Sequence, residues 1–252
     1  MSPVLVLSGS AGHNRTVRRS KCVSVLAAIA ALLAIGAEAP AGAVPLPDPP
    51  ADSAAPPTGR GSQPAQHGGD RTVALTFDDG PSRYTPAILA VLRRHHVRAT
   101  FCMLGDEAQR HPALARRVVL EGHQVCNHTQ DHADMRRLPA KHARREVVAA
   151  ERQIRDAAGV APRIFRFPYG SSGRPARQVI RGYGMRVLDW DVDPRDWTRP
   201  GASTITARVV RGVRHRSVVL LHDGGGDRSS TAAALDATIR ALRQRGYRFV
   251  LA

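Results

Sequence analysis

The sequence predicts an α/β fold built on a sheet of about seven parallel strands, and two observations support this. From residue 73 onward, short apolar runs alternate with segments whose apolar residues recur at helical spacing. Alternation of this kind gives parallel strands connected by helices, in an open sheet or in a closed barrel. The chain has 252 residues, 42% of them hydrophobic, which is enough for one sizeable domain.

Seven segments have the length and the apolar content of buried strands. They are residues 73–77, 99–103, 124–127, 164–166, 185–189, 217–222 and 248–251.

Helical patterns fill the gaps between these strands. An apolar stripe predicts a helix over residues 86–95, and a strongly charged pattern predicts a long one over residues 139–158. The Ser-Thr pair at 203–204 is expected to cap a helix that runs to residue 213. A second Ser-Thr pair, at 230–231, is expected to cap a helix that ends before Gly246.

The chain begins with the pattern of a secretory signal peptide. Arg15, Arg18, Arg19 and Lys21 form a basic region, and residues 23–35 are an apolar stretch rich in Ala and Leu. Residues 41–43 read Ala-Gly-Ala, a small-residue cleavage site. The apolar stretch is short for a membrane span, so we expect cleavage before Val44, with an uncleaved anchor as the alternative. The Sec route is expected, because the residues after Arg18-Arg19 fit a twin-arginine signal poorly.

These features divide the chain into a signal peptide over residues 1–43, a linker over residues 44–70 and one folded domain over residues 71–252. The linker is rich in Pro, Ala, Gly and Ser and has almost no large apolar residues, so it is expected to be disordered. The protein is therefore expected to be secreted, without stable membrane insertion once the signal is removed.

The formal charge of +16 raises the question of a nucleic-acid partner. The basic residues are almost all arginines scattered along predicted amphipathic helices, with no basic cluster interleaved with aromatic residues and no nucleic-acid motif. We therefore expect no nucleic-acid partner. A solvated surface, attracted electrostatically to an anionic cell wall, accounts for the charge.

The most informative stretch is Thr76-Phe77-Asp78-Asp79-Gly80, where two adjacent carboxylates end an apolar strand. Acids at the carboxyl end of an inner strand lie where α/β proteins place their chemistry. Adjacent carboxylates repel each other unless a positive group lies beside them, and a metal ion bound to one leaves the other free as a base. Taken alone, an Asp-Asp-Gly turn is more often simple loop chemistry.

Four further segments follow predicted strands, so all five motifs converge on one rim of the sheet. They are His128-Thr129-Gln130-Asp131-His132, Arg166-Phe167-Pro168-Tyr169-Gly170, Asp193-Pro194-Arg195-Asp196-Trp197 and Leu220-Leu221-His222. In this order the motifs resemble those of the NodB-like polysaccharide deacetylases, carbohydrate esterase family 4, over residues 71–252. The resemblance implies an irregular (β/α) barrel of about seven parallel strands and a metal-dependent polysaccharide deacetylase.

A metal site is expected at Asp79, His128 and His132. Three residues separate the two histidines, so one helical turn or a tight loop can point both imidazoles at one ion. With Asp79 they make a two-His, one-carboxylate set with open positions, typical of a catalytic metal site. In a chain with 11 histidines the spacing alone favours surface residues, and the resemblance reverses this. Zinc is the expected metal, with cobalt and manganese as alternatives.

The resemblance also implies catalytic roles. Asp78 is the expected general base, oriented by Arg166, and the backbone N–H of Tyr169 is expected to bind the oxyanion. His222 is the expected general acid, with its pKa raised by a hydrogen bond to Asp196.

Trp197 and Leu220 are expected to line a small apolar pocket for the acetyl methyl group. The expected reaction is N-deacetylation of N-acetylglucosamine units in peptidoglycan or chitin oligomers. The alternatives are O-deacetylation of acetylated xylan and a non-catalytic wall-binding module on the same fold, although the intact catalytic residues argue against the latter. The sequence does not indicate an oligomeric state.

Two cysteines, Cys102 and Cys126, stay in the chain after the signal peptide has taken Cys22 with it. They lie on strands expected to be consecutive and parallel, and secretion places them in an oxidising compartment. A disulfide and a pair of buried free thiols are both compatible with this placement.

Overall fold

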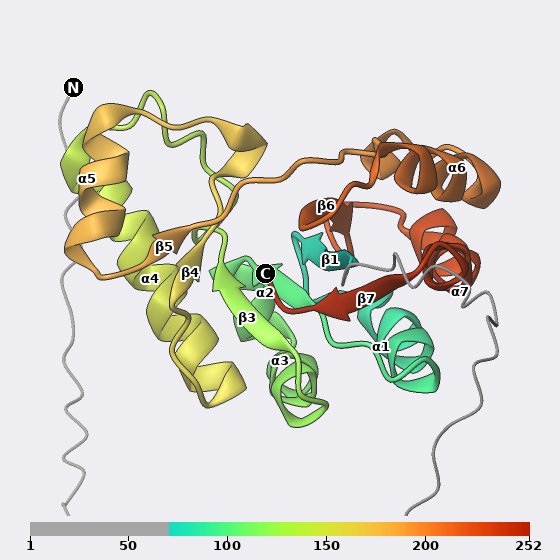
Figure 1. Cartoon of the computed structure of the whole chain (residues 1–252). Coiled ribbons are helices and arrows are strands. Elements are labelled where there is room, and N and C mark those ends of the chain that lie inside the picture. Colours follow the sequence, from blue (N-terminus) through green and yellow to red (C-terminus); the bar gives the residue numbers. More distant parts are fainter. Residues whose placement is uncertain (1–70) are drawn as a thin grey trace, which may run out of the picture. The chain divides into compact units, whose positions relative to one another are not determined.

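The computed structural model describes residues 71–252, which form an α/β domain (Figure 1). The predicted signal peptide over residues 1–43 and the predicted linker over residues 44–70 lie outside the described residues. No helix in the described part of the chain is both long and apolar enough to cross a membrane.

Seven strands form one parallel sheet, as predicted. They are β1 (Arg71–Asp78), β2 (Thr100–Met103), β3 (Gln124–Asn127), β4 (Ile164–Phe165), β5 (Arg186–Val187), β6 (Ser217–His222) and β7 (Tyr247–Val250). Their order is β5-β4-β3-β2-β1-β6, and β7 also pairs with β1. β1 is the central strand, because it pairs with β2, β6 and β7.

The sheet curls into an irregular barrel, but the strands at its two edges, β5 and β6, do not pair with each other. Beyond β5, one bridge between Val192 and Val219 of β6 joins the two edges of the sheet. The backbone N–H of Leu220 donates to the carbonyl of Val192 across the same gap, at 2.9 Å. β4 and β5 have two residues each, so both are shorter than the predicted strands at 164–166 and 185–189.

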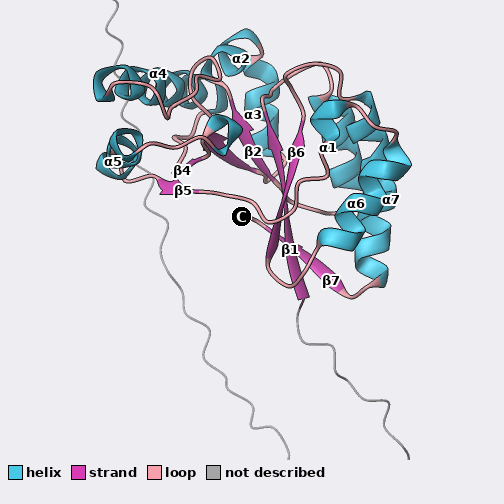
Figure 2. Cartoon of the chain, turned by 90° about the horizontal axis from the view of Figure 1, so that it is seen from above, coloured by secondary structure: helices cyan, strands magenta, loops and turns pink. Residues whose placement is uncertain are grey.

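Helices cover the outside of the sheet in two groups, with α1, α6 and α7 on one side and α2 to α5 on the other (Figure 2). They are α1 (Thr85–Arg94), α2 (Gly105–Arg110), α3 (Pro112–Leu120), α4 (Ala140–Ala158), α5 (Arg174–Gly182), α6 (Ala202–Gly212) and α7 (Ser229–Gln244). Two 3₁₀ helices, η1 (Pro168–Gly170) and η2 (Asp196–Thr198), lie in connections between them. The predicted helix at 86–95 is α1, shifted by one residue, and the predicted helix at 139–158 is α4, which starts one residue later and ends where predicted.

The predicted side-chain caps of α6 and α7 are wrong. The residues that precede these helices are Gly201 and Arg228, and neither makes a side-chain hydrogen bond to the first turn. Thr231 lies inside the first turn of α7, and its hydroxyl donates to Asp196 Oδ2 at 2.7 Å. The Thr231 hydroxyl is therefore hydrogen-bonded to Asp196, a residue distant in sequence, and does not cap α7.

Side chains alternate along β1 between two environments. Val73, Leu75 and Phe77 pack with the helices in the main hydrophobic core, where the Phe77 ring stacks on Phe101 with centroids 5.1 Å apart. Because side chains of a strand alternate in direction, Asp78 points to the opposite, inner face of the curled sheet. The pattern of the strand therefore directs this carboxylate away from the core.

The structure joins Cys102 of β2 and Cys126 of β3 in a disulfide. The two residues are register partners on adjacent parallel strands, and their Cα atoms are 4.2 Å apart. They are fully buried in a small cluster with Ile164 and Leu188. Of the two alternatives left by the sequence, the disulfide is the one found.

Candidate active site

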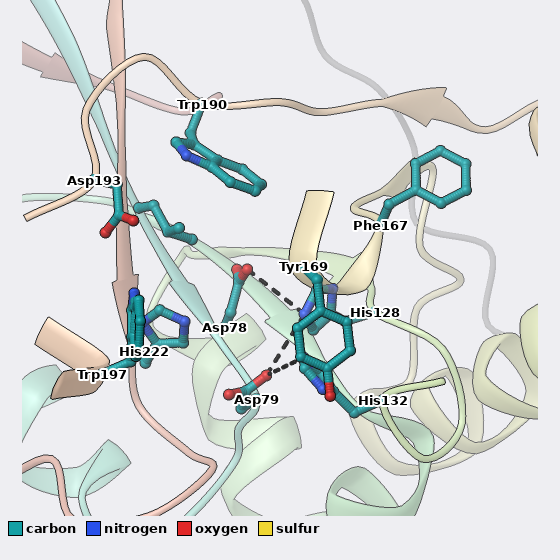
Figure 3. A pocket seen from close by; sticks show the side chains of 11 residues that line it. Asp78, Asp79, His128, His132, Phe167, Tyr169, Trp190, Asp193, Trp197 and His222 are labelled. Atoms are coloured by element: carbon teal, nitrogen blue, oxygen red, sulfur yellow. Dashed lines mark ion pairs between the residues drawn. The ribbon is translucent and has the colours of Figure 1, made fainter. Parts of the chain in front are cut away.

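The five predicted motifs meet at the carboxyl ends of the strands, around a cavity of about 400 Å³ (Figure 3). The cavity is lined by Asp78, Asp79, His128, His132, Phe167, Tyr169, Trp190, Asp193, Trp197, Leu220 and His222.

The three predicted metal ligands lie together in this cavity. One ligand atom from each of Asp79, His128 and His132 lies within 4.8 Å of the other two. Asp79 Oδ1 is 3.2 Å from His132 Nε2 and 3.5 Å from His128 Nε2. The H-x-x-x-H segment is a loop rather than a helical turn, with φ of +71° at both Thr129 and His132.

The contacts of these side chains fit a divalent metal ion. Asp79 Oδ1 is buried and has no hydrogen-bond partner, which is costly for a carboxylate unless a cation binds it. His128 Nδ1 lies 2.8 Å from the carbonyl oxygen of Arg166, which only accepts, so Nδ1 carries the proton and the lone pair of Nε2 faces Asp79. Burial lowers the pKa of His132 despite the opposing charge of Asp79, which favours the neutral imidazole that ligates metals.

The glycine-rich loop after β6 approaches Asp79 closely. Gly225 has a φ of +69°, and a Cβ atom at this position would collide with the Asp79 carboxylate. The glycine therefore leaves room for the carboxylate of Asp79.

Asp78 and Arg166 form a buried ion pair behind the metal-ligand set. Arg166 Nη1 donates to Asp78 Oδ1 at 2.8 Å and to Thr76 Oγ1 at 2.7 Å, and its Nε donates to the carbonyl of Leu188 at 3.2 Å. Arg166 is completely buried, so its guanidinium position is fixed by these acceptors. The second oxygen of Asp78 faces the cavity, 3.6 Å from His128 Nε2.

His222 lies beside Asp78, because the two residues are register partners on β6 and β1. Its Nδ1 is 2.7 Å from Asp196 Oδ1, and its backbone N–H donates to Asp196 Oδ2 at 2.9 Å. Burial alone would lower the pKa of His222, but the hydrogen bond and charge of Asp196, with the charges of Asp78 and Asp79, raise it to about 9. The imidazole is therefore protonated at neutral pH.

The remaining predicted residues also border the cavity. Tyr169 has a φ of +59°, and its exposed ring contacts His132 with centroids 4.4 Å apart. Trp197, 44% exposed, and the buried Leu220 supply apolar wall. Figure 3 shows Trp197 next to His222, with Tyr169 and His132 across the cavity from them.

Several residues at or behind the site were not singled out from the sequence. Thr231 donates to Asp196, as described above. Asp223 is buried, accepts from Thr85 Oγ1 at 2.6 Å, and has a pKa raised to about 7, chiefly by burial. The buried guanidinium of Arg228 donates to the carbonyls of Gly224 and Gly225 at 2.7 and 2.9 Å, which holds the glycine-rich loop in place.

The missed residues differ in the signal that they left. Asp223 directly follows the His222 motif, so a search of the motif's neighbours would have found it. Phe167, Trp190 and Asp193, which line the cavity, also lie in or near the motifs. Thr231 and Arg228 carry no local signal, because their partners are brought to them only by the fold.

Comparison with known proteins agrees with this geometry. Residues 65–188 match the family described as polysaccharide deacetylase. A chitooligosaccharide deacetylase from Bradyrhizobium sp. (strain ANU 289) is 44% identical over 180 residues, which are 69% of this chain and 82% of that protein. A peptidoglycan-N-acetylglucosamine deacetylase from Bacillus cereus (strain ATCC 14579) is 37% identical over 188 residues, which are 72% of this chain and 86% of the relative.

A solved structure is also similar to this one. The family 4 carbohydrate esterase from Streptomyces lividans, in complex with acetate, has a TM-score of 0.67 and 34% identity, over 70% of this chain and 90% of that chain. The chain therefore belongs to the polysaccharide deacetylase family, and it is a hydrolase that acts on carbon–nitrogen bonds in carbohydrates.

Proposed function

We propose that this protein is a secreted, metal-dependent enzyme that removes N-acetyl groups from N-acetylglucosamine units of peptidoglycan or chitin oligomers. The observation that carries the proposal is one cavity in which the Asp78 carboxylate and the His222 imidazole flank three side chains that could hold a metal ion. The two curated relatives act on these two kinds of N-acetylated carbohydrate, according to their names. Secretion rests on the signal-peptide pattern of residues 1–43.

Asp79, His128 and His132 would hold the metal. Two imidazoles and one carboxylate are ligands that zinc favours, and cobalt or manganese are the alternatives. When bound, the cation polarises the acetyl carbonyl and lowers the pKa of water in the site.

The chain's own residues supply the proton transfers. Asp78 is held by Arg166 through one carboxylate oxygen and offers the other to the attacking water, from which it takes a proton as the C–O bond forms. His222 keeps Nδ1 engaged with Asp196, so its Nε2 proton is the one delivered to the departing nitrogen. The C–N bond breaks, and the products are acetate and a free amine on the sugar.

The walls of the cavity orient the acetyl group. Leu220 and Trp197 line the cavity and would offer an apolar surface to the methyl group, and the backbone N–H of Tyr169 would bind the developing oxyanion. The similar family 4 carbohydrate esterase from Streptomyces lividans was solved in complex with acetate, which is the product proposed here.

Acetate release from peptidoglycan, a chitooligosaccharide and acetylated xylan, measured side by side with zinc supplied, tests the proposal. We expect release from an N-acetylated substrate. Release from acetylated xylan alone would make the protein an esterase, and release from none of the three would favour a non-catalytic wall-binding module.

A further inference from the structure

We propose that a cluster of arginines beside the cavity binds acidic groups on the same glycan strand that the enzyme deacetylates. The inference rests on the proposed function and refines its substrate to a carboxylate-bearing glycan, as opposed to a neutral one. The α5 arginine cluster consists of Arg136, Arg144, Arg174, Arg177 and Arg181, all exposed.

Three members of the cluster share one face of α5. Arg174, Arg177 and Arg181 are spaced at i, i+3 and i+7, so their side chains leave the helix in nearly the same direction. The opposite face carries Ala176 and Ile180, which are fully buried. The three guanidinium groups therefore form a row along the outside of the helix.

The other two members come from neighbouring segments packed against α5. A Cβ atom placed on Gly173 would lie 2.9 Å from the carbonyl oxygen of Arg136, so the two backbones touch at the start of α5. Arg144 of α4 donates from Nε to the hydroxyl of Tyr183 at 2.8 Å, just past the end of α5. The cluster therefore spans α5 from one end to the other.

The cluster is continuous with the cavity. Arg136 follows His132 closely in the chain, and Arg174 follows Tyr169 closely. Both His132 and Tyr169 line the cavity. The guanidinium carbon of Arg177 lies 5.5 Å from the centroid of the Phe167 ring, and Phe167 is on the cavity wall (Figure 3). A glycan held in the cavity would reach the cluster after a short distance along the rim.

No member of the cluster has a carboxylate partner, which is also true of most other arginines in residues 71–252. Within residues 71–252, no carboxylate lies within 4.0 Å of a guanidinium nitrogen of the five members. The nearby Asp134 accepts instead from Ser171 Oγ at 2.6 Å and from the backbone N–H of Arg136 at 3.0 Å. Four arginines of α1, α3 and α7 have carboxylate partners. Arg93 and Arg117 pair with Glu121, and Arg94 and Arg240 pair with Asp236.

This arrangement costs stability unless an anion binds. Like charges on one surface repel, and Arg174 occupies the first turn of α5, where the helix dipole disfavours a cation and no acid compensates. Guanidinium groups match carboxylates in shape and hydrogen-bond geometry. Acidic groups on the bound glycan strand would supply negative counter-charges for the α5 arginine cluster.

The test compares two substrates with equal numbers of sugars, a carboxylate-bearing peptidoglycan fragment and a neutral chitooligosaccharide. The variant Arg174→Gln/Arg181→Gln should raise KM for the peptidoglycan fragment by about 3- to 10-fold, with kcat unchanged and with no effect on the neutral substrate. Added salt should raise the same KM in the wild type and much less in the variant.

A matched control is Arg98→Gln/Arg211→Gln, which removes two exposed arginines outside the cluster. It should leave both KM values unchanged. Equal effects of the two double variants, or equal effects of the cluster variant on both substrates, would overturn the proposal. The proposal would also be overturned if the cluster variant bound inorganic polyphosphate more weakly but bound the peptidoglycan fragment as tightly as the wild type. The arginine surface would then bind a phosphate polymer and not the carboxylates of the substrate.

Failure of this proposal differs from failure of the proposed function. If the wild type releases acetate from the neutral oligosaccharide but shows no charge dependence, only the arginine surface is refuted. If neither substrate releases acetate, the deacetylase assignment fails. In that case calorimetric binding of the two substrates to the wild type and the cluster variant still decides whether the arginines bind carboxylates.

Discussion

Asp78 and Asp79 are neighbours in the chain, yet their carboxylates make different contacts. Asp78 Oδ1 accepts from Arg166 at 2.8 Å, whereas Asp79 Oδ1 has no hydrogen bond and faces two imidazoles. The φ of +71° at Asp79 turns the chain between the two residues, so both carboxylates face the same cavity from different sides. These contacts are the basis for proposing proton transfer by Asp78 and metal binding by Asp79.

Conservative changes should separate these two tasks. Asp78→Asn keeps the size of the side chain but cannot accept a proton, so metal should stay bound while kcat falls by about 10²- to 10⁴-fold. Asp79→Ala removes a metal ligand, so metal affinity should fall severely, as it should in His128→Ala and His132→Ala. Bound metal and acetate release are measured on the same purified variants.

Excess metal provides the control for this assignment. It should partly restore activity to Asp79→Ala and should not restore it to Asp78→Asn. Equal loss of metal from the two aspartate variants would refute the division of tasks.

The pair of Asp196 and His222 predicts a pH effect. His222 donates its proton only while protonated, and its pKa of about 9 keeps it so through neutral pH. Asp196→Asn removes the negative charge that raises this pKa and leaves at most a weaker, neutral hydrogen-bond acceptor, so the alkaline limb of kcat should move to lower pH and kcat at neutral pH should fall. A pH profile of kcat at saturating metal checks this, and an unmoved alkaline limb would show that His222 is not the proton donor.

At the scale of residues, the sequence predicted those site residues that lie within short contiguous motifs. Asp78, His128, Arg166 and His222 each end or follow a strand, so the βα pattern alone brought them to one rim. Thr231 was missed because its role depends on Asp196, which lies 35 positions away and meets it only in the folded chain.

At the scale of elements, strands were predicted better than helix ends. An apolar run is a property of the segment itself, so all seven strands were located from it. The short β4 and β5 were predicted too long, because the backbone pairing between these two strands extends over only two residues of each. The start of α7 was misassigned because a hydroxyl can either cap a helix or serve a distant partner.

The disulfide between β2 and β3 should contribute to stability. It closes a loop with a sequence separation of 24, so Cys126→Ser should lower the free energy of unfolding by about 2–4 kcal/mol. Chemical denaturation of the two proteins without reductant measures the difference. A thiol assay on the unfolded, unreduced protein lacking residues 1–43 should detect no free thiol, and two titratable thiols would contradict the bridge.

At the scale of the whole molecule, the N-terminal sequence predicts a processed protein. The basic, apolar and small-residue segments follow in the order of a secretory signal, so the mature chain should begin near Val44. Intact mass of the protein recovered from the medium of a producing culture decides this. A recovered chain that still carries residues 1–43 would show that the predicted cleavage does not occur.

The position of β1 in the sheet has a consequence for the biogenesis of the protein. β1 is the first described strand, but Arg71 pairs in register with Tyr247 of β7, and Asp78 pairs with His222 of β6. Such contacts join residues that leave the ribosome far apart in time, and they close slowly. A chain interrupted before residue 247 would already hold every residue of the candidate active site, yet its central strand would lack the last partner that completes the sheet.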